Sequence, residues 1–363
     1  MTQETHLGFF AALRRDLLSA FGGDDHPTAR QLRRRRVLLS GLVLPLFFIV
    51  GLPLAYIGLM HNPTPNGMEI DVIGHNPAAS KFIATAKQAS NDSEFTIKQV
   101  ATVDEAKSRI TTLDARAAID PATNTLYTAK AGNATATSAA QTYVTAIATA
   151  SGQQVTVEDL APLPSSDAVG TGVMYVGLGA MIGGFLTTTT ASIVAPRIRI
   201  RTKIVVLAFM SIAAAAVQIL ISYGITGTLH GNMWNVAAMS AALAFTCGII
   251  NLAGFTLFGP IQLVISIGLF IFLGVPASGV PIGIDMTSSF FQFLHPYLPT
   301  SAAFDGLKRI VYFDSNGLWP RYVTLGVWTA VAGIGLLIAH KRRAQAVSDY
   351  YAVKSKESAT ADT

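Results

Sequence analysis

Residues 274–313, GVPASGVPIGIDMTSSFFQFLHPYLPTSAAFDGLKRIVYF, decide how the rest of the chain is arranged. The stretch is almost as apolar as the hydrophobic runs on either side of it, yet prolines interrupt it repeatedly. Backbone that leaves helical geometry at membrane depth must be buried in protein or line a wet cavity. The stretch therefore predicts a re-entrant element, in which Pro276 and Pro281 break the preceding span and short helices form at residues 288–294 and 302–313.

The composition is typical of a membrane protein. Of the 363 residues, 51% are hydrophobic and 13% are charged, against roughly a quarter charged in ordinary soluble domains. The net charge of +5 is uneven, because residues 61–167 carry 7 Lys and Arg against 11 Asp and Glu, a balance of −4 that leaves +9 elsewhere. We assign the basic excess to membrane flanks and expect no nucleic-acid partner. The single cysteine, Cys247, excludes a disulfide within one chain.

Uncharged apolar runs predict a polytopic α-helical membrane protein with six transmembrane helices. The runs lie at residues 37–60, 168–195, 204–226, 234–258, 261–274 and 322–339. Basic residues cluster at 33–36, 197–203 and 341–343, all on one side if the chain crosses six times. Cytoplasmic loops carry an excess of Lys and Arg. We therefore expect a multi-pass protein of the plasma (inner) membrane, with cytoplasmic termini at residues 1–36 and 340–363 and with residues 61–167 outside.

An amphipathic helix is expected before the first span, over residues 5–21. Apolar side chains recur there at helical spacing, with Arg14, Arg15 and Asp16 between them. Such a helix either lies on the cytoplasmic leaflet of the membrane or packs on a soluble partner.

Residues 61–167 predict an extracytoplasmic α/β domain, inserted between the first span and a five-helix block at residues 168–339. Alternating hydrophobicity and helical periodicity place its elements in order. Strands are expected at 68–74, 95–100, 116–119, 125–129 and 154–157, and helices at 77–89, 103–112 and 134–151. Thr102 and Asn133 are expected to be N-caps. Acids and histidines are scattered singly here, so we expect neither a metal site nor a catalytic site, and no enzyme.

Ionisable residues near membrane depth occur only in the re-entrant stretch. Asp285 and His295 are expected to face water at the outer surface. Asp305 is spaced three and four residues from Lys308 and Arg309, which predicts a local ion pair on an interfacial helix. A role of this cluster in gating or in contacting a lipid headgroup is the alternative.

Uncharged polar residues inside the spans have two interpretations. Thr188, Gln218, Asn251 and Gln262 either line a pathway or hydrogen-bond between packed helices. Gly184 belongs to a glycine-rich run in the second span, for which close helix packing and a substrate path are again the alternatives. Asn251 and Gln262 flank a tight turn at 258–260 and could pair across it.

Three stretches resemble a known family. Residues 102–107 (TVDEAK) with 117–121 (AAIDP), the glycine-rich 177–184 (GLGAMIGG), and 274–279, 294–299 and 306–313 (GVPASG, LHPYLP, GLKRIVYF) occur in the order seen in type 2 ABC exporter permeases. The likeness is greatest to the phage-infection-protein (YhgE/Pip) branch. It covers nearly the whole chain and implies a dimerising permease with an amphipathic elbow helix at residues 1–36.

The resemblance implies a membrane permease subunit that moves or presents an amphiphilic or lipid-like cell-envelope substrate. No Walker-type phosphate loop is present, so any ATP hydrolysis is expected from a separate partner subunit, and the chain itself is expected to need no cofactor. The alternative is a non-transporting accessory or scaffold protein whose external domain binds an envelope lipid transporter or a cell-wall factor. The short cytoplasmic loop at 196–203 favours this alternative. Expected partners are the bilayer, a second copy or another membrane transporter.

Overall fold

A computed structural model of the chain describes residues 29–58, 61, 63–89 and 93–361. The expected amphipathic helix at residues 5–21 lies outside these residues. The chain divides into two compact units between Leu54 and Ala55. The first unit contains helix α2 (Ala29–Leu52), which is followed by a π-helical turn, η1 (Pro53–Ile57). The expected first span at residues 37–60 is thus helical as far as it is described.

The second unit contains the sheet domain, residues 63–167, and every strand and helix predicted there is present within two residues. The strands are β1 (Met68–Ile73), β2 (Phe95–Val100), β3 (Ala117–Asp120), β4 (Thr125–Thr128) and β5 (Thr156–Asp159). The helices are α4 (Pro77–Ala89), α5 (Val103–Thr111) and α6 (Ala134–Ala150). The side chains of Thr102 and Asn133 accept backbone N–H bonds from Glu105 and Ala136, which confirms both N-caps.

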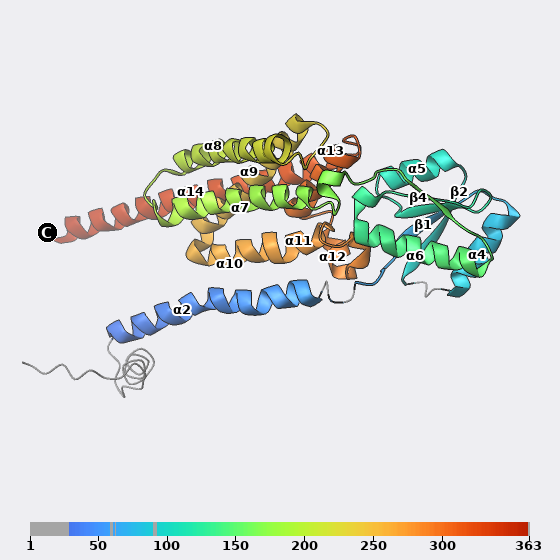
Figure 1. Ribbon diagram of the computed structural model, residues 1–363. Helices are drawn as coiled ribbons and strands as arrows, with labels where there is room; N and C mark the ends of the chain where they lie inside the picture. The colour runs from blue at the N-terminus through green and yellow to red at the C-terminus, as the bar shows by residue number, and fades with distance from the viewer. Residues whose placement is uncertain (1–28, 59–60, 62, 90–92, 362–363) are drawn as a thin grey trace, which may run out of the picture. The chain divides into compact units, whose positions relative to one another are not determined.

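The five strands form one mixed sheet in the order β2-β1-β3-β4-β5. β1 pairs in parallel with β2 and β3, β3 and β4 form an antiparallel hairpin, and β4 pairs in parallel with β5. One face of the sheet packs on α4 and α6 through residues such as Ile70 and Phe82, and the other packs on α5 through residues such as Ile110 (Figure 1). Helices on both faces of a sheet are typical of α/β architecture.

The rest of the second unit is a helical block that follows the sheet domain (Figure 1). Its long helices are α7 (Gly172–Ile193), α8 (Ile200–Ile219), α9 (Met233–Phe258) and α14 (Trp319–Ala361). A further helical run comprises α10 (Gln262–Ile267), the π-helical η6 (Gly268–Leu273) and α11 (Gly274–Ala277), and another π-helical turn, η4 (Leu220–Ile225), extends α8.

Within the described residues, four helical segments are long and apolar enough to cross a membrane. They are Gly172–Ile193, Ile200–Ile225, Met233–Ala277 and Trp319–Ala339, and Gly41–Ile57 is a shorter apolar helix. The third segment is a hairpin, because the Ser266 hydroxyl donates to Asn251 at 2.6 Å. In a straight helix these two residues would stand about 22 Å apart. The reversal occurs at Gly259, whose φ of 68° favours glycine.

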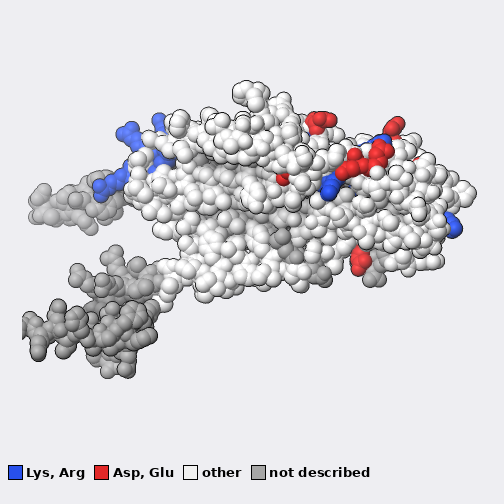
Figure 2. All heavy atoms as spheres, in the orientation of Figure 1, with Lys and Arg blue, Asp and Glu red and all other residues white. Residues whose placement is uncertain are grey.

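The outside of the helical block is strongly apolar. Large side chains such as Phe209, Ile212 and Leu337 are each about two-thirds exposed, a pattern that a soluble surface rarely carries over such an area. Figure 2 shows an uncharged band over these helices, with basic side chains near the α7–α8 connection and acidic ones toward the sheet domain. The chain is therefore built as a membrane protein.

The stretch at 274–313 folds into three short elements after α11. These are η7 (Ile284–Met286), α12 (Ser289–Leu294) and α13 (Pro299–Tyr312). Both predicted short helices are present, but α13 begins three residues early, because Pro299 is favourable at a first helical position.

The predicted break at Pro276 is wrong. This residue lies inside α11, directly after the wide π-helical turn η6, and the chain leaves helical geometry only at Gly279, with a φ of 67°. A Cβ at Gly279 would also approach the backbone of Ile284. Both the positive φ and this close approach therefore favour glycine at the turn. Pro281 lies in the irregular segment that follows α11.

Candidate functional site

Residues 274–313 join the hydrophobic cores of the sheet domain to the helical block. Ile282 and Met286 are buried in the core between the sheet and helices α4 and α6. Phe313 is buried in the core beneath α5. Between these two points, α13 packs on α7, α9 and α14 and is buried along nearly its whole length. The stretch is therefore a structural connector as well as a candidate site.

Asp285 is paired rather than facing water, which corrects the expectation from sequence. The Arg116 guanidinium donates to both of its carboxylate oxygens, from Nε at 2.8 Å and from Nη2 at 2.9 Å. The two side chains are only 11% and 15% exposed. Nearby, the Asn133 amide donates to the carbonyl of Val280 at 3.1 Å. Bidentate arginine–carboxylate pairs fix orientation, so this pair fixes the position of residues 280–287 against the sheet domain.

We expect Arg116→Ala to loosen the attachment between the sheet domain and residues 274–313. The substitution leaves the largely buried Asp285 carboxylate unpaired, at a cost of about 1.5–3 kcal/mol. Hydrogen–deuterium exchange of the full chain should rise locally at residues 280–287. The exposed Lys130 provides the control, since Lys130→Ala removes a positive charge nearby without breaking an ion pair. Unchanged exchange in Arg116→Ala would contradict the structural role.

Asp305 accepts two arginines and is almost fully buried. Its Oδ2 receives the Nε–H of Arg309 at 2.8 Å and that of Arg321 at 2.7 Å, and the Asp305 side chain is 6% exposed. The pair with Arg309 is confirmed, but Lys308 makes no ion pair with Asp305 among the described residues, and the pair is buried. Arg309 Nη2 also donates to the carbonyl of Thr112 in the sheet domain at 2.9 Å. The cluster thus connects α13, α14 and the sheet domain.

Two pKa values in this cluster are strongly shifted. Burial, the largest influence on Asp305, raises its pKa, but the positive charges of Arg309, Arg321 and Lys308 outweigh it and hold the pKa at about 2. Burial of the Lys308 ammonium lowers its pKa to about 8, although the Asp305 charge opposes the shift. The Lys308 side chain keeps partial exposure through a cavity of about 30 Å³ that it lines with Tyr312 and Lys130.

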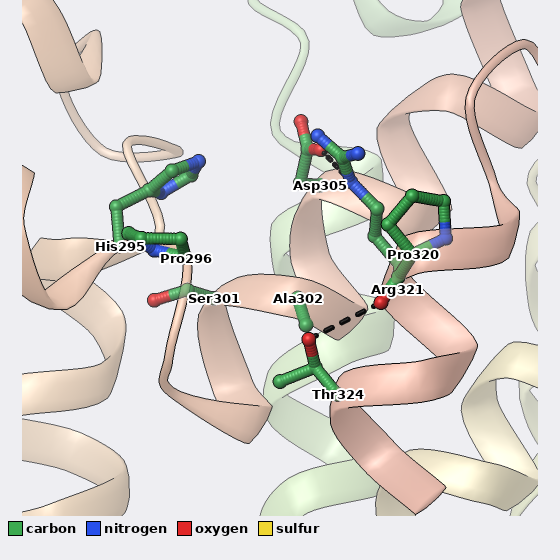
Figure 3. A pocket seen from close by; sticks show the side chains of 8 residues that line it. All are labelled: His295, Pro296, Ser301, Ala302, Asp305, Pro320, Arg321 and Thr324. Atoms are coloured by element: carbon green, nitrogen blue, oxygen red, sulfur yellow. Dashed lines mark hydrogen bonds and ion pairs between the residues drawn. The ribbon is translucent and has the colours of Figure 1, made fainter.

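A larger pocket lies beside the Asp305 cluster, and we call it the His295–Arg321 pocket (Figure 3). It has a volume of about 130 Å³. Its lining residues are His295, Pro296, Ser301, Ala302, Asp305, Pro320, Arg321 and Thr324. His295 and Pro296 stand on one side and Pro320 and Arg321 on the other, with Ala302 and Asp305 between them (Figure 3). The pocket is therefore formed where the end of α12, the start of α13 and the start of α14 meet.

His295 belongs to this pocket and not to the open outer surface. Its Nδ1 lies 2.7 Å from the carbonyl oxygen of Ala277, which can only accept. Nδ1 must therefore carry the proton. Burial lowers the pKa of His295, so the ring is neutral near pH 7 and its Nε2 is a hydrogen-bond acceptor.

Three exposed aromatic residues lie one or two positions from residues that line the pocket. Phe293, Tyr297 and Trp319 are each more than half exposed. The indole of Trp328 on α14 donates to the carbonyl of Tyr297 at 2.7 Å, which ties the rim of the pocket to the last long helix. Trp and Tyr concentrate where a membrane meets water, because their rings have an apolar body and a polar edge.

The uncharged polar residues of the spans mostly hold helices together. The amide nitrogen of Asn251 lies 2.9 Å from Phe185 O, Thr188 Oγ1 and Thr189 Oγ1. Ser266 donates to Asn251 and receives the amide of Gln262 at 3.0 Å, so Asn251 and Gln262 are linked across the hairpin through Ser266. All are buried. Gln218 donates to Val176 O at 3.0 Å, between α8 and α7.

Asn251→Ala is expected to destabilise the hairpin of α9 and α10. It leaves the buried hydroxyl of Ser266 without its acceptor and the hydroxyls of Thr188 and Thr189 without the Asn251 amide, at a cost of about 1–3 kcal/mol. The thermal midpoint of unfolding in detergent measures this loss. Asn235→Ala on the same helix is the control, because within the described residues the Asn235 side chain makes a single long hydrogen bond, of 3.4 Å to Ser315. Equal thermal midpoints for the two variants would contradict a stabilising role of the Asn251 hydrogen bonds.

Sequence reasoning missed Arg116 and Arg321 as members of the site. Each is a basic residue beside an element boundary, which gave no indication of its partner. Within the described residues, no group of three or more His, Cys, Asp or Glu side chains could hold a metal ion.

Comparisons with protein-family models, with curated proteins and with solved structures find no match to this chain. The arrangement of its own residues therefore has to support any function.

Proposed function

We propose that the second unit crosses the membrane five times and that α2 provides a sixth crossing. The basic α7–α8 connection then lies in the cytoplasm, and the sheet domain and the His295–Arg321 pocket lie outside. The run from Gln262 to Ala277 is about 24 Å long at 1.5 Å per residue, somewhat less than a hydrocarbon core of about 30 Å. Residues 278–313 then form a re-entrant cap at the outer end of this crossing, and α13 within the cap is buried against α7, α9 and α14.

In this arrangement the chain functions as a permease-like subunit that moves or presents an amphiphilic cell-envelope substrate at the outer face of the plasma membrane. The observation that carries the proposal is the His295–Arg321 pocket. It combines ionised and polar side chains, and exposed aromatic residues lie one or two positions from its lining residues in the sequence, on a block whose outer surface is apolar. A lipid-like molecule matches this pairing, because its headgroup fits the polar pocket while its chains stay along the apolar helices.

Reconstitution of the full chain in vesicles tests this proposal. Fluorescent phospholipid and diacylglycerol analogues in the inner leaflet should reach the outer leaflet faster in vesicles with the protein than in empty ones, or should be retained by the purified protein. Thr324→Leu, which fills the pocket from α14, should abolish either effect. If no amphiphile is bound or moved, with or without an added ATPase subunit, the proposal fails.

A second candidate function is that of a scaffold without transport activity. It is favoured by the α7–α8 connection, residues 194–199, which contains no helix on which an ATPase subunit could dock. In that case the sheet domain is the partner-binding domain, and it binds an envelope lipid transporter or a cell-wall factor.

Chemical crosslinking in intact cells, followed by mass spectrometry, separates the two candidates. Crosslinks from residues 194–203 to an ATP-binding subunit support the permease. Crosslinks from the sheet domain to another membrane transporter, with none to an ATPase, support the scaffold.

A further inference from the structure

The His295–Arg321 pocket offers a mixed set of unused hydrogen-bonding groups. Nδ1 of His295 is occupied by Ala277, which leaves Nε2 as an acceptor. Oδ2 of Asp305 receives two guanidinium bonds, while its Oδ1 makes none among the described residues. Arg321 uses Nε for Asp305 and Nη1 for Gly317 O, so Nη2 remains a donor.

Thr324 adds a further acceptor on the α14 side. Its hydroxyl donates to the carbonyl of Pro320 at 3.2 Å, and the oxygen keeps its lone pairs (Figure 3). Three acceptors and one donor therefore line one small pocket, and the charged side chains of its lining, Asp305 and Arg321, are paired with each other.

This set discriminates between the common lipid headgroups. A phosphate only accepts hydrogen bonds, so it would meet Arg321 favourably but face the Asp305 carboxylate and the bare Nε2 of His295. An ammonium only donates, and it would lie beside the Arg321 guanidinium with Arg309 behind it. A hydroxyl both donates and accepts. Several hydroxyls on one ring can satisfy all of these groups without adding a charge.

We propose that the His295–Arg321 pocket binds one uncharged, polyhydroxylated ring, such as the sugar of a glycolipid headgroup. The inference rests on the proposed function and names its substrate class. A volume of about 130 Å³ has room for on the order of ten water-sized groups, which corresponds to one monosaccharide. Phe293 and Tyr297, both exposed and close in sequence to His295, would be available to contact the attached chains.

The test uses the full chain purified in a zwitterionic detergent that carries no sugar. Binding of four probes is compared by native mass spectrometry and by thermal shift. They are monoglucosyl-diacylglycerol, the same diacylglycerol without glucose, phosphatidylglycerol and free glucose. The glucosyl lipid is expected to bind at least about tenfold more tightly than diacylglycerol or phosphatidylglycerol, since the loss of one hydrogen bond raises the dissociation constant by about tenfold.

Two variants locate the binding. Thr324→Leu fills the pocket with a larger side chain and removes the hydroxyl. It should lower the affinity for the glucosyl lipid by about tenfold or more. Val323→Leu, at an exposed neighbouring position on α14, is the matched control and should bind normally. Both positions lie on one helix, so equal melting temperatures confirm that folding is unchanged.

The outcomes separate this inference from the proposed function. If all three lipids bind equally and Thr324→Leu weakens all of them, the pocket takes an amphiphile but the sugar inference is overturned. If no lipid binds, both are overturned. If free glucose binds as tightly as the glucosyl lipid, the hydroxyl chemistry is supported and the ligand is a free sugar rather than a lipid headgroup.

Discussion

Asp305→Ala is expected to lower the free energy of unfolding by about 3–5 kcal/mol, because it leaves two guanidinium groups without their shared carboxylate. Arg309 is 6% exposed and Arg321 is 25% exposed, so water cannot fully replace the lost partner at Arg309. A markedly lower melting temperature of the purified protein in detergent would show the effect. Glu158→Ala is the control, since it breaks an ion pair with Lys107 at an exposed site and should leave the melting temperature unchanged.

The same carboxylate predicts a pH dependence. The pKa of Asp305 is about 2 in the folded protein and has an ordinary value of 3.8. A carboxylate with a depressed folded pKa contributes stability that is fully present above its ordinary value. That contribution is lost as the pH falls from about 4 toward 2. The melting temperature of the wild-type protein should therefore fall more steeply between about pH 4 and pH 2 than that of Asp305→Ala. Parallel plots of melting temperature against pH for the two proteins would contradict the role given to Asp305.

Gly184→Leu is expected to have the second large effect, by separating α7 from α9. A Cβ added at Gly184 would overlap the carbonyl group of Ala244, so even one carbon forces the two helix backbones apart. Gly248 on α9 faces the same contact, since a Cβ there would approach Gly184 O at 2.9 Å. Overpacking typically costs about 1–3 kcal/mol, and a backbone overlap in a membrane block should exceed that range and reduce the yield of folded protein.

Gly183 supplies the control for this prediction. Nothing lies within 4 Å of a Cβ built at Gly183, although it is the adjacent residue on the same helix. Gly183→Ala should therefore be neutral or slightly stabilising, by about 0.5–1 kcal/mol, because alanine favours the helix. Monodisperse elution after purification distinguishes the two variants. Similar yields for both would mean that α7 and α9 do not approach as closely as Gly184 indicates.

The elements of the sheet domain could be predicted because their signals are local. Alternation of apolar side chains, and the caps Thr102 and Asn133, depend on residues close in sequence. The same holds for the pair of Asp305 and Arg309, which lie one helical turn apart. Close packing at Gly184 was also one of the two interpretations open from its sequence.

The partners of Asp285 and the second arginine of Asp305 could not be predicted in the same way. Arg116 and Asp285 are 169 residues apart in sequence, and no periodicity connects a strand with a loop beyond the fifth apolar run. The break predicted at Pro276 failed because a π-helical turn adjoins this proline within the helical run. In each case tertiary packing, rather than local propensity, determines the outcome.

In the proposed function, residues 278–328 form an outer receiving site for an amphiphile. The most direct measurement is photocrosslinking of the full chain in vesicles, with a glycerolipid that carries a diazirine at its headgroup, and mapping of the adducts by mass spectrometry. Adducts concentrated on α12, the start of α13 and the first turns of α14, and lost in Thr324→Leu, are the predicted result. Adducts spread evenly over the apolar surfaces of α8 and α14, with none at the pocket and no effect of Thr324→Leu, would contradict it.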